Sequence, residues 1–485
     1  MSSQGAEQLS FDFLPDLPVV VQPSDGQLSS DAGLLALRQF DQRWNYTARM
    51  ARCLFDPKPS RDQSLLSMLR QRIFGILAGY EDCNDHDTLR EDPVFKLIAD
   101  RLPDGKALAS QPTLSRFENL ATPAVLQKLI DFTIDTGIER LKQKHGGTPG
   151  DQSPGPGTLP GSLTLDLDAT DDPTHGHQQL TLFHGYFGQY QYFPLIISEP
   201  TTKHVFVAWL RPGTVHASLG AEDDLMRVVN ALRAQRPDIA IHVRGDAGFG
   251  LPKMYEVCEE NGLSYTFGFS TNSRLRKLTE GLMNQAVERY EQSKQKQRLF
   301  ECFEYQAETW DHPRTVVAKA ECHEQGTNLR FVVTNRLGVL SSDDAEGRAS
   351  AAEGRASAGQ REYDDYIQRG ESEQRMDEMK NGLHMDRLSC HRFMANFFRL
   401  LLHTAAMNLL NAVRDDKTLP EVMRVGQPCT WRTHVIKVAA VIVQSTRRIL
   451  VKLAANWPWW PLYQAAGKRS LSFSWAEGEA PAAGP

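Results

Sequence analysis

The sequence predicts an α+β protein in which a helical N-terminal region precedes a mixed β-sheet covered by helices. Apolar residues recur at helical spacing through residues 31–144, for example along the stripe from Leu65 to Leu77. A Gly/Pro-rich stretch at 145–161 then separates two parts of the chain. Beyond it, several strand-like runs are followed by alternating helical and strand-like patterns, which favours a mixed sheet with helices on its faces.

The net charge of the whole chain and the charge of residues 390–470 favour different classes of protein. The chain has 485 residues, enough for two to four domains, and 41% of them are apolar. A net charge of −6 counts against a DNA-binding protein. Residues 390–470, however, hold 12 Lys and Arg against 3 Asp and Glu, a local net charge of +9. A basic surface of this kind is what binding to phosphate groups requires.

The cysteines and the N-terminus indicate a cytoplasmic protein. Seven scattered cysteines form no Cys-x-x-Cys pair, which favours reduced thiols. Residues 1–16 lack the basic start and the apolar core of a signal peptide. The longest apolar stretch, near 435–443, is too short to span a bilayer. We therefore expect a soluble protein without a membrane partner.

The N-terminal region is expected to be helical after a disordered start. Residues 1–30 are polar and show little periodicity, which predicts disorder. Within the helical region 31–144, a short helix at 110–117 opens with Ser110 as N-cap and Pro112 in its first turn. Its Gln, Ser and Arg side chains suit a DNA major groove, so 31–144 is a candidate DNA-end-binding domain. A plain helical bundle is the alternative.

The Gly/Pro linker 145–161 leads into the expected core, which comprises residues 162–270 and 362–413. The stretch between them, 271–340, is expected to form a β-rich insertion domain. The core strands are expected at 163–168, 181–187, 190–198, 203–210, 239–244 and 265–269, with helices at 222–235 and 251–261. The insertion is expected to contain a helix at 279–298 and strands at 299–306, 314–320 and 329–334.

The remaining segments are assigned by composition. Residues 341–361 contain the sequence Ala-Glu-Gly-Arg-Ala-Ser-Ala twice in tandem, over 345–358, which predicts an exposed low-complexity loop. Residues 414–470 form a basic C-terminal region for DNA binding or dimerisation, with a β-rich run and a basic helix at 434–456. The tail 471–485 is expected to be disordered.

Two aspartates follow apolar strands. Leu163 to Asp168 alternates apolar and polar residues and ends on an acid, and Asp246 follows the strand 239–244 in the same way. Sites of α/β sheets gather at the carboxyl ends of strands. Two carboxylates side by side need a cation, and hard divalent ions with oxygen ligands fit best. The alternative for each aspartate is a turn or capping role.

A third acid lies on a helix with other polar groups. Tyr366, Arg369, Glu373 and Lys380 have offsets of 0, 3, 7 and 14 residues, which place all four on one narrow face of a helix. An acid flanked by a hydroxyl and two cations suits a metal ion and phosphates. A solvated helix with Glu–Lys pairs is the alternative. Gly370 indicates that the helix begins near it.

These residues resemble the Y-(2)-R-(3)-E-(6)-K signature of DDE transposases from bacterial insertion sequences, and group 1 of the DDE transposases in particular. Asp168-Ala169-Thr170 resembles the family's first Asp-x-Thr motif, and the stretch 244–249 resembles the second motif, which contains Asp246. Asp168 is chosen among four nearby aspartates, the others being Asp166, Asp171 and Asp172. The resemblance covers about 163–465.

The resemblance implies a ribonuclease H-like catalytic core with an insertion between the second aspartate and the glutamate. It implies Asp168, Asp246 and Glu373 as catalytic metal ligands for two Mg²⁺ ions, with Mn²⁺ as a substitute. Trp310 is the candidate to stack on an extruded base, and strand packing is the alternative. The expected partners are double-stranded transposon ends and target DNA, with two copies of the protein acting as a homodimer on the bacterial nucleoid.

Two rival hypotheses remain open. The first is a catalytically silent DNA-binding regulator derived from a transposase. The repeat at 345–358 supports this alternative, whereas the presence of all three acids speaks against it. The second is another ribonuclease H-like nuclease, which would cut structured nucleic acid without joining strands. Tyr366, Arg369 and Lys380 favour DNA-end phosphates over a small molecule as the substrate.

Overall fold

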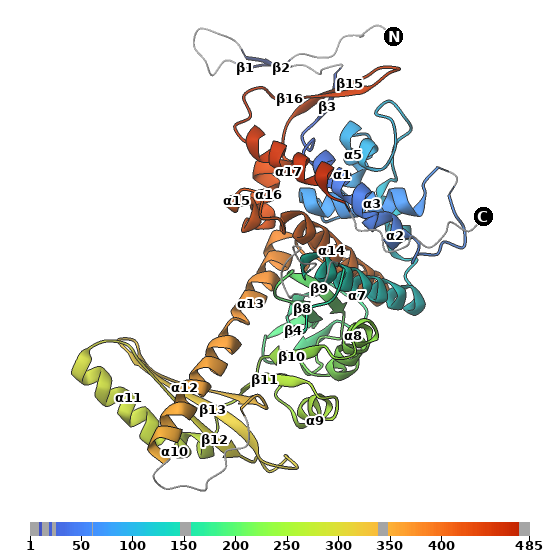
Figure 1. Ribbon diagram of the computed structural model, residues 1–485. Helices are drawn as coiled ribbons and strands as arrows, with labels where there is room; N and C mark the ends of the chain where they lie inside the picture. The colour runs from blue at the N-terminus through green and yellow to red at the C-terminus, as the bar shows by residue number, and fades with distance from the viewer. Residues whose placement is uncertain are drawn as a thin grey trace.

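The computed structural model describes residues 9–11, 19–21, 26–60, 62–145, 157–337 and 348–474. The disorder expected at 1–30 and 471–485 is wrong for β1 (Leu9–Phe11) and β2 (Val19–Val21), which pair with each other, and for 471–473, where the last helix ends and Phe473 is buried. The other residues of 1–25, residues 475–485 and most of the linker 145–161 lie outside the described residues. A large body and a smaller lobe make up the molecule, and a long helical connection joins them (Figure 1).

Residues 34–145 fold into helices, as their periodicity predicts. Helix α3 shows why: Ser64 caps its N-terminus by accepting a hydrogen bond from the Ser67 N–H, and Gly79 ends it with a φ of 89°. Ser110 is the N-cap of α6, with Pro112 in the first turn, as the sequence predicts. The helices are α1 (Leu34–Trp44), α2 (Tyr46–Ala51), α3 (Leu65–Ala78), α4 (His86–Leu89), α5 (Pro93–Ile98), α6 (Gln111–Glu118) and α7 (Pro123–His145).

One large sheet runs through the molecule in the order β12-β13-β14-β11-β10-β4-β8-β9. Strands β4, β10 and β11 are parallel neighbours, and the other neighbours are antiparallel. The body strands are β4 (Ser162–Ala169), β8 (Leu195–Glu199), β9 (His204–Trp209), β10 (Ala240–Gly245) and β11 (Ser264–Phe269), with helices α8 (Ala221–Gln235) and α9 (Pro252–Glu260).

The strand expected at 190–198 is two strands. It breaks at Phe193-Pro194, because proline offers no N–H to a continuing ladder. The first half joins a small separate sheet of order β5-β7-β6, and the second half is β8 of the main sheet. The small sheet consists of β5 (Asp172–Pro173), β6 (Leu182–His184) and β7 (Gln189–Tyr192).

The strands expected in the insertion extend the main sheet and do not form a sheet of their own. Strand β14 pairs with β11, so the lobe continues the body. Helix α11 packs on one set of apolar side chains of the lobe and α12 on another, as Ala286 and Tyr363 illustrate. The lobe elements are α10 (Ser273–Leu278), α11 (Glu280–Ser293), β12 (Gln297–Tyr305), β13 (Arg314–His323), β14 (Gly326–Thr334) and α12 (Arg348–Ile367).

The expectation of a loop over 341–361 is wrong from residue 348 onward. The second copy of the repeat lies inside α12, because Ala, Glu and Arg are strong helix formers. Gly359 of this helix lies so close to the strand beneath it that a Cβ there would stand 2.4 Å from the Cys302 sulfur. The second copy of the repeat is therefore part of a helix, and the residue that directly follows it packs against β12.

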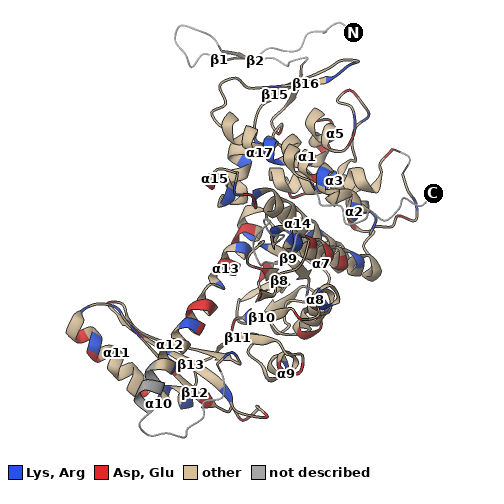
Figure 2. Cartoon of the chain, viewed as in Figure 1, with Lys and Arg blue, Asp and Glu red and all other residues tan. Residues whose placement is uncertain are grey.

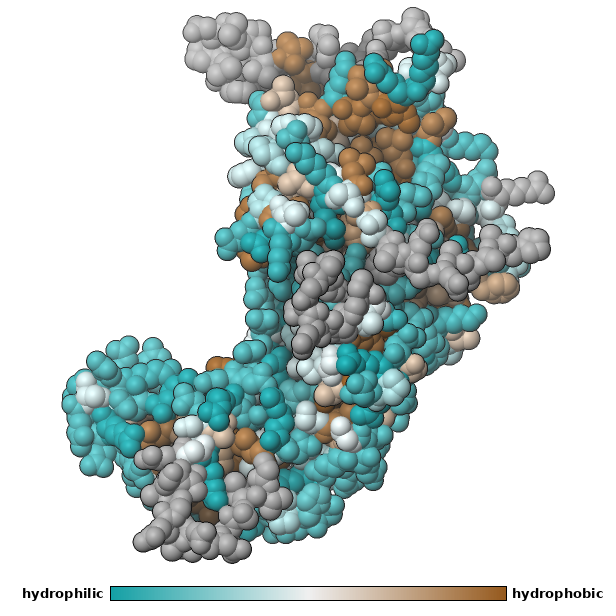
Figure 3. Space-filling view, in the orientation of Figure 1, coloured by the Kyte–Doolittle hydropathy of each residue, from teal (hydrophilic) through white to brown (hydrophobic). Residues whose placement is uncertain are grey.

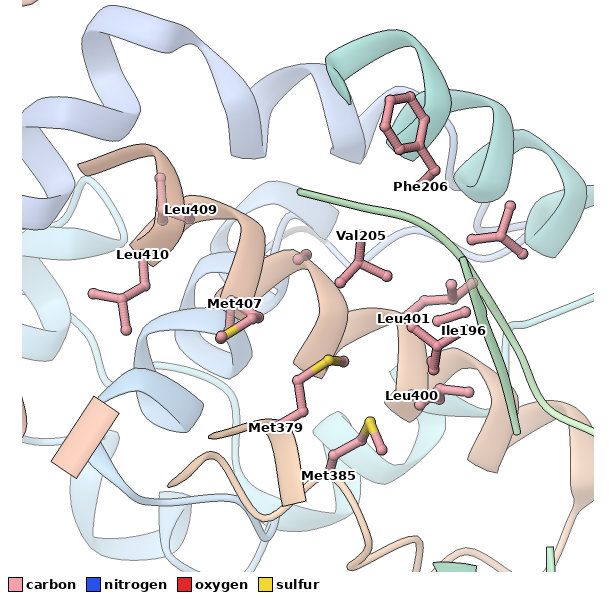
Figure 4. Close-up of a cluster of buried hydrophobic side chains, with 14 of the residues drawn as sticks. Ile196, Val205, Phe206, Met379, Met385, Leu400, Leu401, Met407, Leu409 and Leu410 are labelled. Atoms are coloured by element: carbon pink, nitrogen blue, oxygen red, sulfur yellow. The ribbon is translucent and has the colours of Figure 1, made fainter. Parts of the chain in front are cut away.

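Helices from both ends of the chain cover the edge strand β9. Asn408, on α14 (Phe393–Arg414), accepts from the Val205 N–H and donates to the Val205 carbonyl, both at 2.9 Å. Thr133 of α7 donates to the Phe206 carbonyl at 2.7 Å. These bonds satisfy an edge that would otherwise be open. Figure 4 shows Val205 and Ile196 of the sheet beside Leu400, Leu401 and Met407 of α14.

The C-terminal region forms a small sheet and a final helix. Gln27–Ser29 is strand β3 and pairs with β15, which corrects the expectation that disorder extends to residue 30. The β-rich run expected at 434–456 is present as a hairpin, but no helix of the described residues there matches the expected basic helix. The elements are α15 (Glu421–Arg424), α16 (Pro428–Trp431), η2 (Arg432–Ile436), β15 (Ala440–Gln444), β16 (Ile449–Leu453) and α17 (Trp460–Ser472).

Apolar side chains lie exposed on this small sheet. They come from alternate positions of its strands, and brown atoms gather over β15 in Figure 3. The exposed residues are Leu28, Val441, Val443 and Leu450. Along the described part of the chain, no helix is both long and apolar enough to cross a membrane.

Candidate active site

The two strand-end aspartates lie side by side at one edge of the sheet. Parallel strands β4 and β10 are in register, with Leu167 opposite Gly245. The next residue on each strand is therefore Asp168 and Asp246, as the alternation of the two strands predicts. The Gly248 N–H donates to Asp246 Oδ1 at 2.8 Å and holds that carboxylate at the turn after β10.

Asp168 is a buried carboxyl group with one cation beside it. Arg369 Nη1 donates to Asp168 Oδ1 at 2.7 Å, and the Ser372 hydroxyl donates to Oδ2. Burial raises the pKa of Asp168 to about 7. Arg369 opposes the rise, and Asp166 and Asp246 add to it. Asp168 is therefore held in a buried position by Arg369 and Ser372.

The other three aspartates of the cluster have different partners. Asp166 is fully buried between Arg244 at 2.8 Å and Arg375 at 2.7 Å, so it joins β4 to β10 and to the helix above. Asp171 pairs with Lys380 at 2.9 Å. Burial raises the pKa of Asp172 well above its usual range, and no described residue hydrogen-bonds its carboxyl oxygens. Asp168 is the one that faces Arg369.

The helix that carries the signature is broken in two places. Helix α12 ends at Ile367, and α13 (Gly370–Asp377) begins at Gly370, as the sequence indicates. A π-helical turn, η1 (Glu378–Gly382), then follows. The expectation of one narrow face on a single α-helix is therefore wrong, because 3.6 residues per turn does not hold through these breaks.

Glu373 reaches the aspartates only through Arg369. Arg369 Nη2 donates to Glu373 Oε1 at 2.9 Å, while its Nη1 binds Asp168. The Glu373 side chain is 68% exposed. Arg369 is thus a guanidinium held between two acids, and Asp168 raises its pKa despite burial.

Tyr366 lies against the floor of the same site. A Cβ at Gly268 of β11 would stand 2.8 Å from the Tyr366 hydroxyl oxygen, so only glycine fits there. The Arg369 guanidinium lies 5.8 Å from the centre of the tyrosine ring. Burial raises the pKa of Tyr366, with smaller contributions from Asp246 and Asp168.

Lys380 sits on η1 and faces the start of the small sheet. Its Nζ lies 2.9 Å from Asp171 Oδ1 and 3.4 Å from the Thr170 hydroxyl. Its neighbour Met379 is buried beside Met385 and α14, which anchors the turn in the core (Figure 4). The structure thus brings Tyr366 and Arg369 to the two acids, whereas Lys380 meets Asp171 and Thr170 just after the strand of Asp168.

Trp310 is not at this site. It is 5% exposed and packs among the rings of Tyr255, Phe269 and Tyr305, with Arg314 above it at 5.5 Å. A ring with both faces covered cannot stack on a base in this conformation. Trp310 therefore packs between the strands, which was the alternative to stacking on a base.

The stretch 390–470 is less basic at the surface than its sequence suggests, because some of its Lys and Arg side chains are buried or paired. Arg399 and Arg414 are buried against Glu118 and Glu378, and Lys437 pairs with Asp31. In Figure 2 the ribbon near the label α13 also carries blue and red segments close together. The exposed cations of 390–470 are Arg392, Lys417, Arg424, Arg447, Arg448, Lys452 and Lys468.

The sequence did not identify Ser372 and Arg375 as site residues. Both lie on α13 at spacings of three from Arg369 and bind the acids of β4. This i, i+3 repeat was the available signal, because it places these side chains on one helix face.

The carboxylate pair suits a hard divalent cation. Asp168 and Asp246 are neighbouring oxygen donors of the kind that a hard divalent cation prefers, and Arg369 is the cation that pairs with Asp168 in this structure. Glu373 is turned to Arg369. Among the described residues, no three His, Cys, Asp or Glu side chains gather as a metal-ligand group.

Comparison with known proteins places the chain in a family. No curated protein matches it. A similar solved structure is titled "Cryo-EM structure of piggyBac transposase synaptic complex with hairpin DNA"; it is 11% identical, with 80% of this chain and 77% of that chain covered and a TM-score of 0.34, too low to support an argument. The family described as Transposase DDE domain group 1 matches residues 12–471. Because that match spans nearly the whole chain, the protein belongs to this family of DDE transposases.

Proposed function

We propose that this transposase is active and performs cut-and-paste transposition of an insertion sequence. It would hydrolyse phosphodiester bonds at terminal inverted repeats and join the freed ends to target DNA. The observation that carries the proposal is the register of β4 and β10, which sets Asp168 beside Asp246 under the helix of Arg369 and Glu373. The order β9-β8-β4-β10-β11 supports the assignment of a ribonuclease H-like core.

Asp168, Asp246 and Glu373 are the proposed ligands of two Mg²⁺ ions, with Mn²⁺ as a substitute. Such ions, when bound, would activate the attacking oxygen and stabilise the leaving one. Glu373 is exposed and joined to Asp168 only through Arg369, so Arg369 must release it for it to act as a ligand. Ser372 holds the second oxygen of Asp168 meanwhile.

The cations of the site are proposed to hold DNA phosphates. Arg369 and Lys380 are each paired with a carboxylate, and an incoming phosphate would compete for the same N–H groups. In the first step a water oxygen bonds to phosphorus, the bond from phosphorus to the 3′ oxygen breaks, and a 3′-hydroxyl leaves. In the second step the oxygen of that hydroxyl bonds to a phosphorus of target DNA, the bond from this phosphorus to the target's 3′ oxygen breaks, and a target 3′-hydroxyl leaves.

Further DNA contacts are proposed on the body. Helix α6 buries Leu114 and Phe117 and leaves Arg116 exposed, so its polar side is open to a major groove. The exposed cations of 390–470 would bind flanking phosphates. Two copies of the chain are proposed to pair two transposon ends as a homodimer.

The test is cleavage of end DNA taken from the sequence that flanks the coding region, with and without Mg²⁺. We expect Mg²⁺-dependent nicking by the wild type. In Asp246→Asn and Asp168→Asn, nicking should fall by more than the roughly 10- to 100-fold that loss of a supporting residue costs. Full activity in Asp246→Asn would sink the proposal.

Asp238→Asn is the matched control, because this side chain is 74% exposed and pairs only with Arg236 at the surface. Its nicking rate should equal that of the wild type. Binding of end DNA without nicking would favour the silent regulator, and nicking without strand joining would favour a different nuclease.

A further inference from the structure

Four aromatic rings stand exposed on one hairpin near the candidate active site. The hairpin consists of β6, β7 and the turn between them, and we call residues 182–192 the aromatic hairpin. The exposed fractions are 86% for Tyr186, 59% for Tyr190, 51% for Phe183 and 39% for Phe187. Large apolar groups gathered at the surface indicate a binding surface.

The hairpin backbone holds these rings in place. Phe183 and Tyr190 are directly opposite in the antiparallel pair, with ring centres 5.5 Å apart. Tyr186 and Phe187 lie at the tip, with ring centres 5.0 Å apart. Gly188 turns the chain there with a φ of 67°. The rings are thus presented to solvent by strand pairing.

The aromatic hairpin is rooted in the strand of Asp168. Strand β5 begins four residues after Asp168 and pairs with β7, and the Thr174 N–H donates to the Tyr190 carbonyl at 2.9 Å. Gln189 donates to Asp171, the partner of Lys380, at 3.0 Å. Six residues plus one strand spacing place Tyr190 at most about 25 Å from Asp168. That is about seven nucleotides of a DNA strand.

The chemistry of the surface favours bases over phosphates. No Asp, Glu, Lys or Arg occurs from Pro173 to Pro194, so the hairpin neither repels nor pairs with a polyanion. What it offers is aromatic faces. The bases of an intact duplex hide their own faces by stacking, whereas an unpaired base leaves its face free.

We infer that the aromatic hairpin binds unpaired nucleotides of the DNA strand beside the scissile phosphate, by stacking on Tyr186 and Tyr190. The inference rests on the proposed function, because it takes DNA at this edge of the sheet as the substrate. Such stacking would hold separated DNA strands next to Asp168 and Asp246.

The test measures binding by fluorescence anisotropy in EDTA, so that no cleavage occurs. The probes are a blunt 30-base-pair duplex and the same duplex with six unpaired thymidines on each strand at one end. The wild type should bind the forked probe more tightly. Stacking contributes about fivefold to a hundredfold per base, so Tyr186→Ala/Tyr190→Ala should weaken forked binding at least about fivefold and leave blunt binding unchanged.

Two control variants sharpen the result. Tyr186→Phe/Tyr190→Phe keeps the rings and should keep forked binding. Phe55→Ala removes an aromatic ring that is 69% exposed on another part of the chain and should change neither probe. Equal effects on the two probes, no effect on either, or no fork preference in the wild type would overturn the inference.

Sedimentation of the same variants tests the other occupant of the surface. If Tyr186→Ala/Tyr190→Ala changes the oligomeric state but not DNA binding, the rings bind a second copy of the chain and the inference is wrong. A wild type that prefers forked DNA but never nicks would overturn the proposed activity and leave this inference standing. A wild type that nicks end DNA but shows no preference for forked DNA would overturn this inference and leave the proposed activity standing.

Discussion

The buried carboxylate of Glu118 is kept ionised by opposite charges from other elements. Glu118 of α6 lies between Arg72 of α3 and Arg399 of α14, each at 2.9 Å, and the thiols of Cys83 and Cys390 also donate to it. Burial works to raise the pKa of Glu118, but Arg399 and Arg72 outweigh it and lower the pKa to about 2. One carboxylate thus joins three helices.

Glu118→Gln should destabilise the fold by about 3–5 kcal/mol at pH 7, because two buried guanidinium groups lose their counter-charge. The folded pKa is lowered, so the ionised group stabilises above the ordinary pKa of 4.5 and that stability is lost as the pH falls toward 2. The wild type and the variant should therefore converge between pH 4.5 and 2. Urea unfolding at a series of pH values measures this difference.

Glu139→Gln is the control for that experiment. Glu139 pairs with Arg49 at 2.6 Å, but both side chains are more than a quarter exposed, so the pair contributes only about 0–1 kcal/mol. A Glu118→Gln effect no larger than that of Glu139→Gln, or one that persists unchanged at pH 3, would contradict the explanation.

At the scale of elements, packing decides what a glycine does in the helix α12. Gly354 and Gly359 both belong to the same helix, and Gly354 lies in the second copy of the repeat. A Cβ at Gly354 would meet nothing within 4 Å, whereas one at Gly359 would meet Cys302 and Val317. The same residue type is thus a weak point at one position and a requirement at the other.

Gly354→Ala should stabilise the protein by up to about 1 kcal/mol, since alanine is the better helix former. Gly359→Ala should destabilise it by about 1–3 kcal/mol, because the helix must move off the strand. Urea unfolding followed by circular dichroism compares the two. Adding Cys302→Ala should restore part of the stability that Gly359→Ala loses. Equal effects of Gly354→Ala and Gly359→Ala on stability would argue against close packing at Gly359.

At the scale of the whole molecule, the body has one continuous core. Helix α7 packs on β9, α14 packs on α3, and β3 pairs with β15. Apolar residues of the N-terminal helices, the sheet and the C-terminal region belong to one cluster. The two parts that the linker 145–161 separates in sequence are therefore one unit in space.

Cleavage of the chain at a protease site inserted after Gly150 should leave the two pieces together. The shared core should hold them in one peak on gel filtration, and thermal unfolding should show one main transition for the body. The uncut insertion variant is the control. Elution of the two pieces as separate species would show that the helical region is an independent domain.

The sequence by itself determined the local elements and the sites where they end. The alternation before Asp168 and Asp246 predicted two acids at strand ends, and Gly370 marked the start of a helix, because such patterns depend on neighbouring residues. The family signature predicted that Tyr366, Arg369, Glu373 and Lys380 share one helix face, whereas the structure divides them between α12, α13 with its N-cap residue, and η1. Membership in the DDE transposase family confirms the coarse prediction made from these motifs.

Only the tertiary structure decided which partner each of these residues meets. The Asp-x-Thr context and the strand end favoured Asp168 over Asp166 in sequence, but the ion pair of Asp166 with Arg375, 209 residues away, is visible only in the structure. Trp310 is buried because strands and a helix close over it. Three of the twelve cations of 390–470, namely Arg399, Arg414 and Lys437, pair with acids outside that stretch. A side chain's periodicity is local, but its burial and its ion pairs depend on elements far along the chain, and packing alone brings those together.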